Sequence, residues 1–281
     1  MSEIVVAVMA CFMVLGAADK AIFSGRFGYG EEFEKGLGAM GPLSMSMVGI
    51  MCAAPSIGAF LGPALTPFFT AIGSDPSVAA CMVLGVDSGG LPLALALAKT
   101  HEAAMLSGLG LGGSFGCIMT FALPISLSIC SEESRPDVAR GLVAGIIAAP
   151  FSLFAVAAVM GYGFGDVLRL GLPAFAVAAI LALLLRIDST ASLGMIVSIA
   201  NPLPMYVTLN RMTPEGRVVC SAFSGPVLCL LGDHLGFITA AYPAGTIPML
   251  AGKILSAFLA LLIALLLVRA GRGKRPAASA A

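Results

Sequence analysis

The sequence has 281 residues, of which 59% are hydrophobic and 11% are charged. Soluble domains contain about 45–50% apolar and about 25% charged residues, so this composition excludes an ordinary soluble protein and indicates an integral membrane protein. Lysine plus arginine and aspartate plus glutamate each total 15, which leaves no net charge to attract a nucleic acid.

The cysteines and the first residues of the chain bear on its compartment. The seven cysteines lie in or beside apolar runs without a CxxC pair, so we expect no disulfide, no metal site and no cofactor. The chain opens with Ser2 and Glu3 in place of a basic region, so the apolar run 4–18 is expected to be a retained first helix. We therefore expect a multi-pass protein of a bacterial inner membrane.

Nine segments are long and apolar enough to cross a bilayer, which takes about 20 helical residues. We expect an all-α, polytopic membrane protein that forms a single transport domain over residues 1–281. Segment 57–73 is short and carries Pro63 and Pro67, so it is either a tenth, tilted span or a re-entrant half-helix. The predicted helices span residues 4–19, 37–55, 76–98, 103–130, 137–161, 167–186, 189–210, 216–242 and 246–268.

Basic residues beyond the last segment predict the orientation, because cytoplasmic loops are enriched in lysine and arginine. Arg269, Arg272, Lys274 and Arg275 follow the last apolar run, so the C-terminus, with the basic tail 270–281, is predicted to be cytoplasmic. If segment 57–73 re-enters, the N-terminus is external, and if it crosses, the reverse holds. The positive-inside rule favours re-entrance.

A weak internal repeat with an offset of 113 residues relates two halves, about 37–130 and 137–242. Transporters are often built from such repeats, with the substrate site at the midplane between them. The matched residues are Asp75 with Asp188, Met82 with Met195, Thr100 with Thr213, Glu102 with Glu215, and Gly112 with Gly225.

One helix of each half is interrupted by a polar residue that helix breakers follow. Asp87 stands in VDSGG, and Asn201 stands in ANPLPM. Broken helices occur at membrane depth only where the freed backbone groups line a cavity or are buried in protein, so we expect both residues to line a substrate cavity. Ser88, Gly89 and Gly90 are then candidates for its vestibule or gate. A proline kink needed only for packing is the alternative at each place.

The stretch LGDHLGF at 231–237 places Asp233 and His234 inside one of the most apolar runs of the chain. A carboxylate at mid-bilayer costs about 2.5–3.5 kcal/mol on insertion scales, so such residues usually face a cavity or a partner. We predict that both side chains line a passage for a small cation. A structural acid satisfied by neighbouring polar groups is the alternative. Glu34, before the second helix, is a candidate for an acidic vestibule that concentrates cations.

Two glycine-rich patterns match enzyme motifs without their structural context. GLGLGG at 108–113 fits a dinucleotide-binding pattern and GGSFG at 112–116 fits a hydrolase pattern, but neither follows a predicted strand. Gly108, Gly112 and Gly116 instead recur every four residues, which predicts a small-residue face for close helix packing. We therefore do not expect an enzyme.

Several motifs together resemble the ethanolamine utilisation membrane protein (EutH) family. The resemblance covers about residues 30–253, but the chain is shorter than usual members, with the shortfall expected between about 165 and 190. Pro202 also stands where members have a second asparagine. The motifs are FEKGLGAMG at 33–41, SMVGI at 46–50, DPS at 75–77, VDSGG, NPLPM at 201–205 and LGDHLGF.

The resemblance implies a permease that brings ethanolamine into a bacterium. Ethanolamine is a small ammonium with one hydroxyl, which needs a carboxylate and an Asn or His. The candidate substrate-binding residues are therefore Asp87, Asn201, Asp233 and His234, and the expected partners are ethanolamine, the bilayer and further copies of the chain.

Two other function classes remain open. A gated cation channel, or a proton- or cation-coupled transporter of another small amine, would also use these acids and His234. A membrane-embedded structural subunit would use none of them for transport. The chain contains no G-x-x-x-x-G-K-[ST] loop, so we do not expect self-contained ATP-driven transport.

Overall fold

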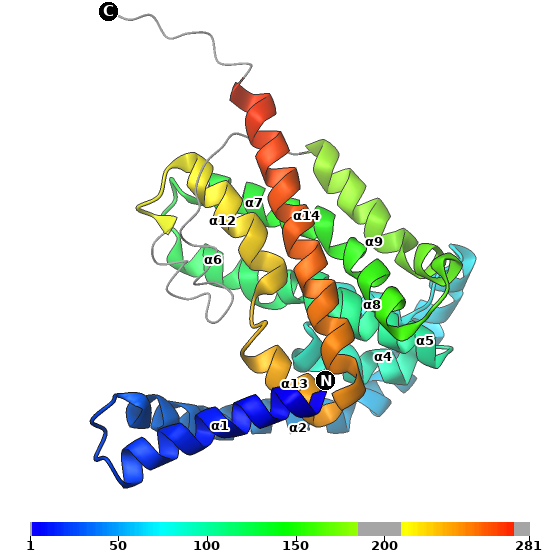
Figure 1. Cartoon of the computed structure of the whole chain (residues 1–281). Coiled ribbons are helices and arrows are strands. Elements are labelled where there is room, and N and C mark those ends of the chain that lie inside the picture. The colour runs from blue at the N-terminus through cyan, green and yellow to red at the C-terminus, as the bar shows by residue number, and fades with distance from the viewer. Residues whose placement is uncertain (1, 185–208, 273–281) are drawn as a thin grey trace, which may run out of the picture.

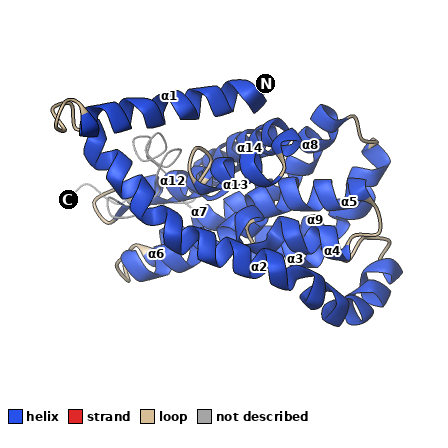
Figure 2. Ribbon diagram, turned by 90° about the horizontal axis from the view of Figure 1, so that it is seen from below, coloured by secondary structure: helices blue, strands red, loops and turns tan. Residues whose placement is uncertain are grey.

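The computed structural model describes residues 2–184 and 209–272, and within these ranges every regular element is helical (Figures 1 and 2). The predicted all-α class is confirmed. The longer helices are α1 (Ser2–Ala21), α2 (Tyr29–Ala71), α7 (Arg135–Ala148), α9 (Phe164–Leu184), α12 (Pro214–Val227) and α14 (Thr246–Arg272). The shorter ones are α3 (Ser77–Val83), α4 (Leu91–Leu97), α5 (His101–Met105), α6 (Leu123–Ile129), α8 (Ser152–Met160) and α13 (Asp233–Ala241). Within these ranges, three π-helices and two 3-10 helices link several of them. The π-helices are η1 (Val86–Gly90), η2 (Leu106–Gly116) and η3 (Ile118–Ala122), and the 3-10 helices are η4 (Ala149–Phe151) and η5 (Pro243–Gly245).

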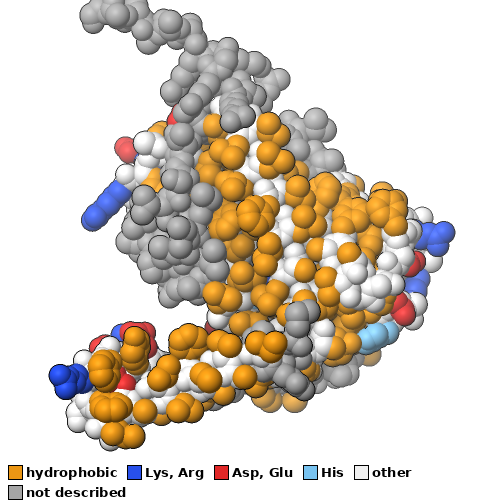
Figure 3. All heavy atoms as spheres, viewed as in Figure 1, with side chains coloured by type: hydrophobic (Ala, Val, Ile, Leu, Met, Phe, Trp, Pro, Cys, Tyr) orange, Lys and Arg blue, Asp and Glu red, His pale blue; other side chains and the backbone are white. Residues whose placement is uncertain are grey.

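Three helical stretches in the described part of the chain have the length and apolarity of membrane spans. They are His101–Ser126, Arg135–Met160 and Pro243–Val268, each of 26 residues, with mean hydropathies of 1.5, 2.4 and 2.5. Hydrophobic side chains cover much of the surface of α14 and of the α1–α2 hairpin, while charged groups gather at the edges (Figure 3). The protein is thus a polytopic integral membrane protein, and the predicted number of nine or ten crossings stays a prediction.

The first two helices form a long hairpin that lies across the lower end of the bundle in Figure 1. Its turn is closed by Asp19, which is buried and accepts hydrogen bonds from the backbone N–H groups of Phe27 (3.0 Å) and Gly30 (2.8 Å). Beyond the hairpin, the second half of α2 packs against α4 and η1. The hairpin therefore joins the rest of the molecule at the segment that contains Asp87.

Segment 57–73 is neither a re-entrant half-helix nor a separate tenth span, because it is the second half of α2. This helix runs unbroken for 43 residues, which at 1.5 Å per residue is about 65 Å and exceeds the hydrocarbon core. Pro63 and Pro67 do not end it, in keeping with the tolerance of membrane helices for proline. The predicted break near residue 56 was wrong.

The predicted interruption at Asp87 is confirmed. Helix α3 ends at Val83, the backbone of Leu84 and Gly85 is extended, and Gly89 has a φ of 112° before α4 begins. Thr120 satisfies the freed backbone groups: its hydroxyl accepts a hydrogen bond from Gly85 N–H (3.0 Å) and donates one to the Val83 carbonyl (2.9 Å). The helix is thus interrupted at Asp87 and not merely bent, and a side chain of another helix satisfies the freed backbone groups.

Thr120→Val should destabilise the break, because two backbone groups of a membrane-embedded segment lose their partner. We expect a loss of about 1–3 kcal/mol, which is the cost of leaving such a group unsatisfied. Thermal unfolding in detergent measures it. Thr120→Ser keeps the hydroxyl and should unfold close to the wild type; equal stability of the valine and serine variants would contradict the role given to Thr120.

The predicted glycine face is also confirmed. Gly108, Gly112 and Gly116 lie buried in a continuous helical stretch. Their nearest neighbours are Leu91, Val86 and Leu84, respectively, which lie in the break or directly beside it. The approach is closest at Gly116, where an added Cβ would lie 2.0 Å from the Leu84 carbonyl oxygen. The enzyme-like glycine patterns therefore serve packing against the broken helix.

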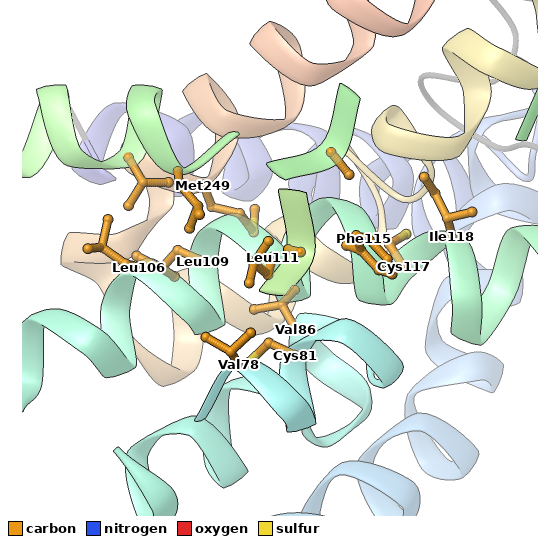
Figure 4. Packing of buried hydrophobic residues seen from close by; sticks show 14 of the residues in the cluster. Val78, Cys81, Val86, Leu106, Leu109, Leu111, Phe115, Cys117, Ile118 and Met249 are labelled. Atoms are coloured by element: carbon orange, nitrogen blue, oxygen red, sulfur yellow. The ribbon is translucent and has the colours of Figure 1, made fainter. Parts of the chain in front are cut away.

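The core lies where these segments meet α8 and α14 (Figure 4). Side chains from α3, the break, η2 and α14 interdigitate there and surround the segment that contains Asp87. Fully or almost fully buried members are Val78, Cys81, Val86, Leu106, Leu109, Leu111, Phe115, Cys117, Ile118 and Met249.

The stretch predicted as one helix over 216–242 is two helices. Helix α12 ends at Val227, directly after Pro226, and α13 begins at Asp233. Cys229 has a positive φ of 57° between them. The preceding proline and the left-handed residue interrupt the backbone ladder, so Asp233 and His234 occupy the first turn of a new helix rather than the middle of a long one.

The remaining predicted helices agree closely with the structure. The pairs are 137–161 with α7 to α8, 167–186 with α9, and 246–268 with α14. Helix α14 continues to Arg272, so the predicted tail 270–281 begins inside a helix, and residues 273–281 lie outside the described residues. The predicted helix 189–210 lies almost wholly outside them too.

The predicted repeat gains one local parallel. Thr100 and Thr213, which match at the offset, both begin helices, and their side chains accept hydrogen bonds from Ala103 N–H (3.1 Å) and Gly216 N–H (3.2 Å). Threonine is a preferred residue at this position, so the parallel also fits two independent helix starts. Because the helix predicted over 189–210, which would match 76–98, lies almost wholly outside the described residues, the repeat stays a prediction.

Candidate substrate site

Two interrupted segments and one continuous helix meet in the interior of the bundle. Asp87 comes from the break between α3 and α4, His234 from the first turn of α13, and Lys253 from the middle of α14. Their exposed fractions are 6%, 0% and 0%. Ionisable side chains buried to this extent in a membrane protein normally pair with one another or line a substrate path.

The three side chains form a chain of contacts through the imidazole. His234 Nε2 lies 3.2 Å from Asp87 Oδ1, and His234 Nδ1 lies 3.0 Å from Lys253 Nζ. The ammonium of Lys253 also donates a hydrogen bond to the Gly113 carbonyl. Because an ammonium can only donate, Nδ1 must be the accepting nitrogen, which leaves the ring proton on Nε2 towards Asp87.

The contact between His234 and Asp87 is close but poorly aligned. Although the two atoms are 3.2 Å apart, neither Asp87 Oδ1 nor His234 Nε2 has a hydrogen-bond partner within the described ranges. Burying a polar group without a partner is costly, by about 1–3 kcal/mol in proteins. Both atoms therefore retain the capacity to bind a small polar molecule.

Small and aromatic residues shape the space around this pair. Gly85 faces Phe121 and Asp87, and a Cβ there would lie 3.3 Å from an atom of each. The Phe121 ring also lies beside His234, with ring centroids 6.3 Å apart and the ring planes tilted by 60°. Cys117, buried on the neighbouring turn, donates through its thiol to the Leu228 carbonyl (3.5 Å). Besides the charged groups, the wall of the site thus combines an aromatic ring and a thiol with the hydroxyls of Ser88 and Thr120, which lie beside Gly85.

The serine of the hydrolase-like pattern lies apart from the acid and the imidazole of the site. Ser114, the serine of the hydrolase-like pattern, shares a hydrogen bond of 3.0 Å with Ser256 and contacts neither acid nor imidazole. Within residues 2–184 and 209–272, no three His, Cys, Asp or Glu side chains gather as metal ligands.

Comparison with known proteins places the chain in a family. The family model of the ethanolamine utilisation protein EutH matches residues 1–189 and 181–267. The chain belongs to the EutH family. The resemblance inferred from the motifs is thereby confirmed, and with it the membership of a family of permease-like membrane proteins.

Curated relatives match nearly the whole chain. The "Probable ethanolamine permease EutH" of Listeria monocytogenes is 29% identical over 90% of each chain. That of Salmonella typhimurium is 26% identical over 95% of each. "Uncharacterized protein YxeR" of Bacillus subtilis is 28% identical over 90% of this chain and 91% of its own. No solved structure matches this chain.

These EutH relatives contain residues that this chain lacks. Their alignments extend over 338 and 389 positions, more than the 281 residues here. The two parts of the EutH model overlap at residues 181–189, which places the missing stretch there. This position agrees with the shortfall expected between about 165 and 190.

The predicted site residues differ in their placement. Asp87 and His234 come together in the interior, and Ser88, Gly89 and Gly90 form the break beside them. Asp233 begins α13 with an exposed side chain and is not part of the buried chain of contacts.

Two further predictions for the site have no direct link to it. Glu34 lies on the α1–α2 hairpin, where its exposed carboxylate pairs with Lys20 at 2.8 Å. Its role as a vestibule stays a prediction. Asn201 lies outside the described residues. The expectation that Asn201 and Asp87 line one cavity therefore stays a prediction.

Lys253 was missed by the sequence reasoning, although a signal was present. It is the only charged residue in the apolar run from Thr246 to Val268, and an ionisable residue within a membrane segment is by default a functional candidate.

Proposed function

We propose that this chain is a permease that moves ethanolamine across the bacterial inner membrane. Several EutH relatives that match nearly the whole chain carry the name of a probable ethanolamine permease. The apolar helices and the buried polar centre between broken segments fit a transporter with its site inside the bundle.

The observation that carries the proposal is the pair of unpartnered atoms, Asp87 Oδ1 and His234 Nε2. Ethanolamine is cationic at neutral pH, as expected of an amine with a pKa near that of lysine, about 10.4, or somewhat below. Its ammonium would donate to the carboxylate, and its hydroxyl would hydrogen-bond to the imidazole. Two methylene groups separate the ammonium from the hydroxyl, which suits binding to Asp87 Oδ1 and His234 Nε2 on neighbouring side chains.

A cavity beside the site offers a route to it. It has a volume of about 540 Å³ and lies between α2, α4 and α13. Leu91 and Pro92 line it directly after the Asp87 break, and Phe237 lines it one turn beyond His234. We propose this cavity as the approach to the site, with Phe237 and Leu91 between cavity and charges.

The orientation follows from charge. Arg269 and Arg272 end α14, and Lys274 and Arg275 follow in sequence. Because positive residues beside membrane segments stay in the cytoplasm, we propose a cytoplasmic C-terminus.

Uptake of labelled ethanolamine into proteoliposomes tests the function and the role of His234. Excess ethylamine, which lacks the hydroxyl, should compete poorly, because sites that hydrogen-bond a hydroxyl reject analogues without it. In His234→Ala we expect the preference for ethanolamine over ethylamine to fall by about tenfold or more. The exposed His101 provides the control, since His101→Ala should keep the preference. Equal competition by ethylamine against the wild type would refute the assignment of the hydroxyl to His234.

A further inference from the structure

Lys253 is a buried cation that the binding scheme above leaves without a role. Its ammonium is fully buried, donates to the Gly113 carbonyl and lies 3.0 Å from His234 Nδ1. Asp87 stands at the other nitrogen of the same ring. With a neutral imidazole, the positive charge of Lys253 and the negative charge of Asp87 cancel, so the empty site is neutral overall.

A cationic substrate upsets this balance. If ethanolamine pairs with Asp87 while Lys253 keeps its proton, two ammonium groups share one buried carboxylate. An uncompensated charge in a water-poor interior is strongly unfavourable. Asp233 on α13 also interacts electrostatically with Asp87 and His234, but its side chain is exposed and lies outside the buried contacts of Asp87, His234 and Lys253. The substrate therefore binds well only when the site loses a positive charge.

We propose that Lys253 is a tethered cation that gives up its proton when the ammonium of the substrate pairs with Asp87, so that the protein exchanges each ethanolammonium for a proton. This inference rests on the proposed transport of ethanolamine. It adds a coupling mechanism and a third residue to the same site.

The proton has a path through the imidazole. Lys253 Nζ passes a proton to His234 Nδ1, and the ring releases its Nε2 proton to the solvent on the side from which the amine enters. The amine keeps all its protons. Lys253 is then a neutral amine whose lone pair accepts from Nδ1–H, and its remaining N–H groups still donate to the Gly113 carbonyl. His234 Nε2 is left as an acceptor for the substrate hydroxyl. Release of the substrate reverses each step.

Few other titratable groups face Lys253. Helices α7 and α12 pack against α14 and carry charged residues of their own. Among these, Asp137 pairs with Arg217 at 3.1 Å and with Arg140 at 3.6 Å. The groups that interact electrostatically with Lys253 are Asp87, His234, Cys117 and Cys229. Cys117 donates its thiol hydrogen to the Leu228 carbonyl (3.5 Å), as only the neutral form can. The charge balance therefore depends on Asp87, His234 and Lys253.

The exchange predicts which gradient drives uptake. Because one positive charge enters for each that leaves, a cycle moves no net charge and the membrane potential does not drive it. A proton gradient does, and uptake is favoured when the lumen is more acidic than the outside. A uniporter for the cation would respond to the potential instead.

Initial rates of labelled ethanolamine uptake into proteoliposomes, with protein-free liposomes subtracted, distinguish these mechanisms. For the wild type we expect the same rate with and without an inside-negative potassium diffusion potential at equal pH, and a faster rate with an acidic lumen. Lys253→Met, which removes the tethered charge, should carry the cation alone, and the same potential should then raise its uptake about tenfold.

Two further variants separate charge from packing. Lys253→Arg should lose saturable uptake, because a guanidinium stays protonated and continues to exclude the substrate. Met249→Leu, on the same helix and beside Gly113, should keep the wild-type pattern of exchange. If Lys253→Met does not fold, proton release on adding ethanolamine to the wild-type protein in weakly buffered detergent, followed with a pH indicator, replaces it.

The outcomes decide between the two proposals. Wild-type uptake that rises with the diffusion potential, or ethanolamine binding without proton release, would overturn the exchange and leave an ethanolamine permease. Absence of saturable uptake under every gradient would instead overturn the proposed function.

Discussion

Asp87→Asn is expected to reduce ethanolamine uptake by at least about 100-fold. The carboxylate is buried, and its Oδ1 lies 3.2 Å from His234 Nε2. Within the described residues, Oδ1 has no hydrogen-bond partner and can therefore accept a hydrogen bond from the substrate. Removing one partner of a buried charge pair costs about 3–5 kcal/mol, and each 1.4 kcal/mol corresponds to about tenfold in affinity. Initial uptake rates in proteoliposomes, normalised to folded protein by size-exclusion chromatography, measure the effect.

Two matched variants show whether position or charge matters. Asp166→Asn removes an exposed acid on α9 and should transport as the wild type does. Asp233→Asn neutralises an exposed acid next to His234 in the sequence. We expect it to reduce uptake less than Asp87→Asn does. Wild-type uptake by Asp87→Asn, or a larger loss in Asp233→Asn, would refute the assignment of the substrate ammonium to Asp87.

Gly116→Ala is expected to disrupt the packing on which the site depends. The added Cβ would lie 2.0 Å from the Leu84 carbonyl oxygen and 2.7 Å from that of Cys81. Both are backbone atoms at the end of α3, so the broken helix itself has to move. We expect a loss of about 3 kcal/mol, at the upper end for overpacking, seen as a lower unfolding temperature in detergent and a low yield of folded protein.

Gly112→Ala provides the control on the same helix face. Its Cβ would meet the nearest atoms at 3.5 Å, which is ordinary van der Waals contact. This variant should be as stable as the wild type or slightly more so, because alanine favours a helix over glycine. A similar loss of stability in both variants would mean that helix propensity or lipid contact, and not the approach to Leu84, determines the tolerance of this face.

The candidate site was predicted in part. VDSGG combines an acid with two glycines inside an apolar run, and this local pattern was enough to place a break at Asp87. His234 was singled out for a similar reason. Asp233 was singled out with it, yet the break between α12 and α13 turns the two neighbours to different surroundings, one exposed and one fully buried. The chain alone does not distinguish them, because adjacent residues share the same hydropathy window.

The sequence by itself determined the membrane class, most helix positions, the break at Asp87, the packing role of the glycine face and the EutH family. All of these follow from local signals, since hydropathy, helix breakers and residue spacing act within a few turns of the chain. Only the tertiary structure decided that α2 is one helix and that Lys253 meets His234 and Gly113, the latter 140 positions away. Such a contact depends on how helices cross. The charge balance of the site, which needs Asp87, His234 and Lys253 at once, could therefore emerge only after packing had brought three distant segments together.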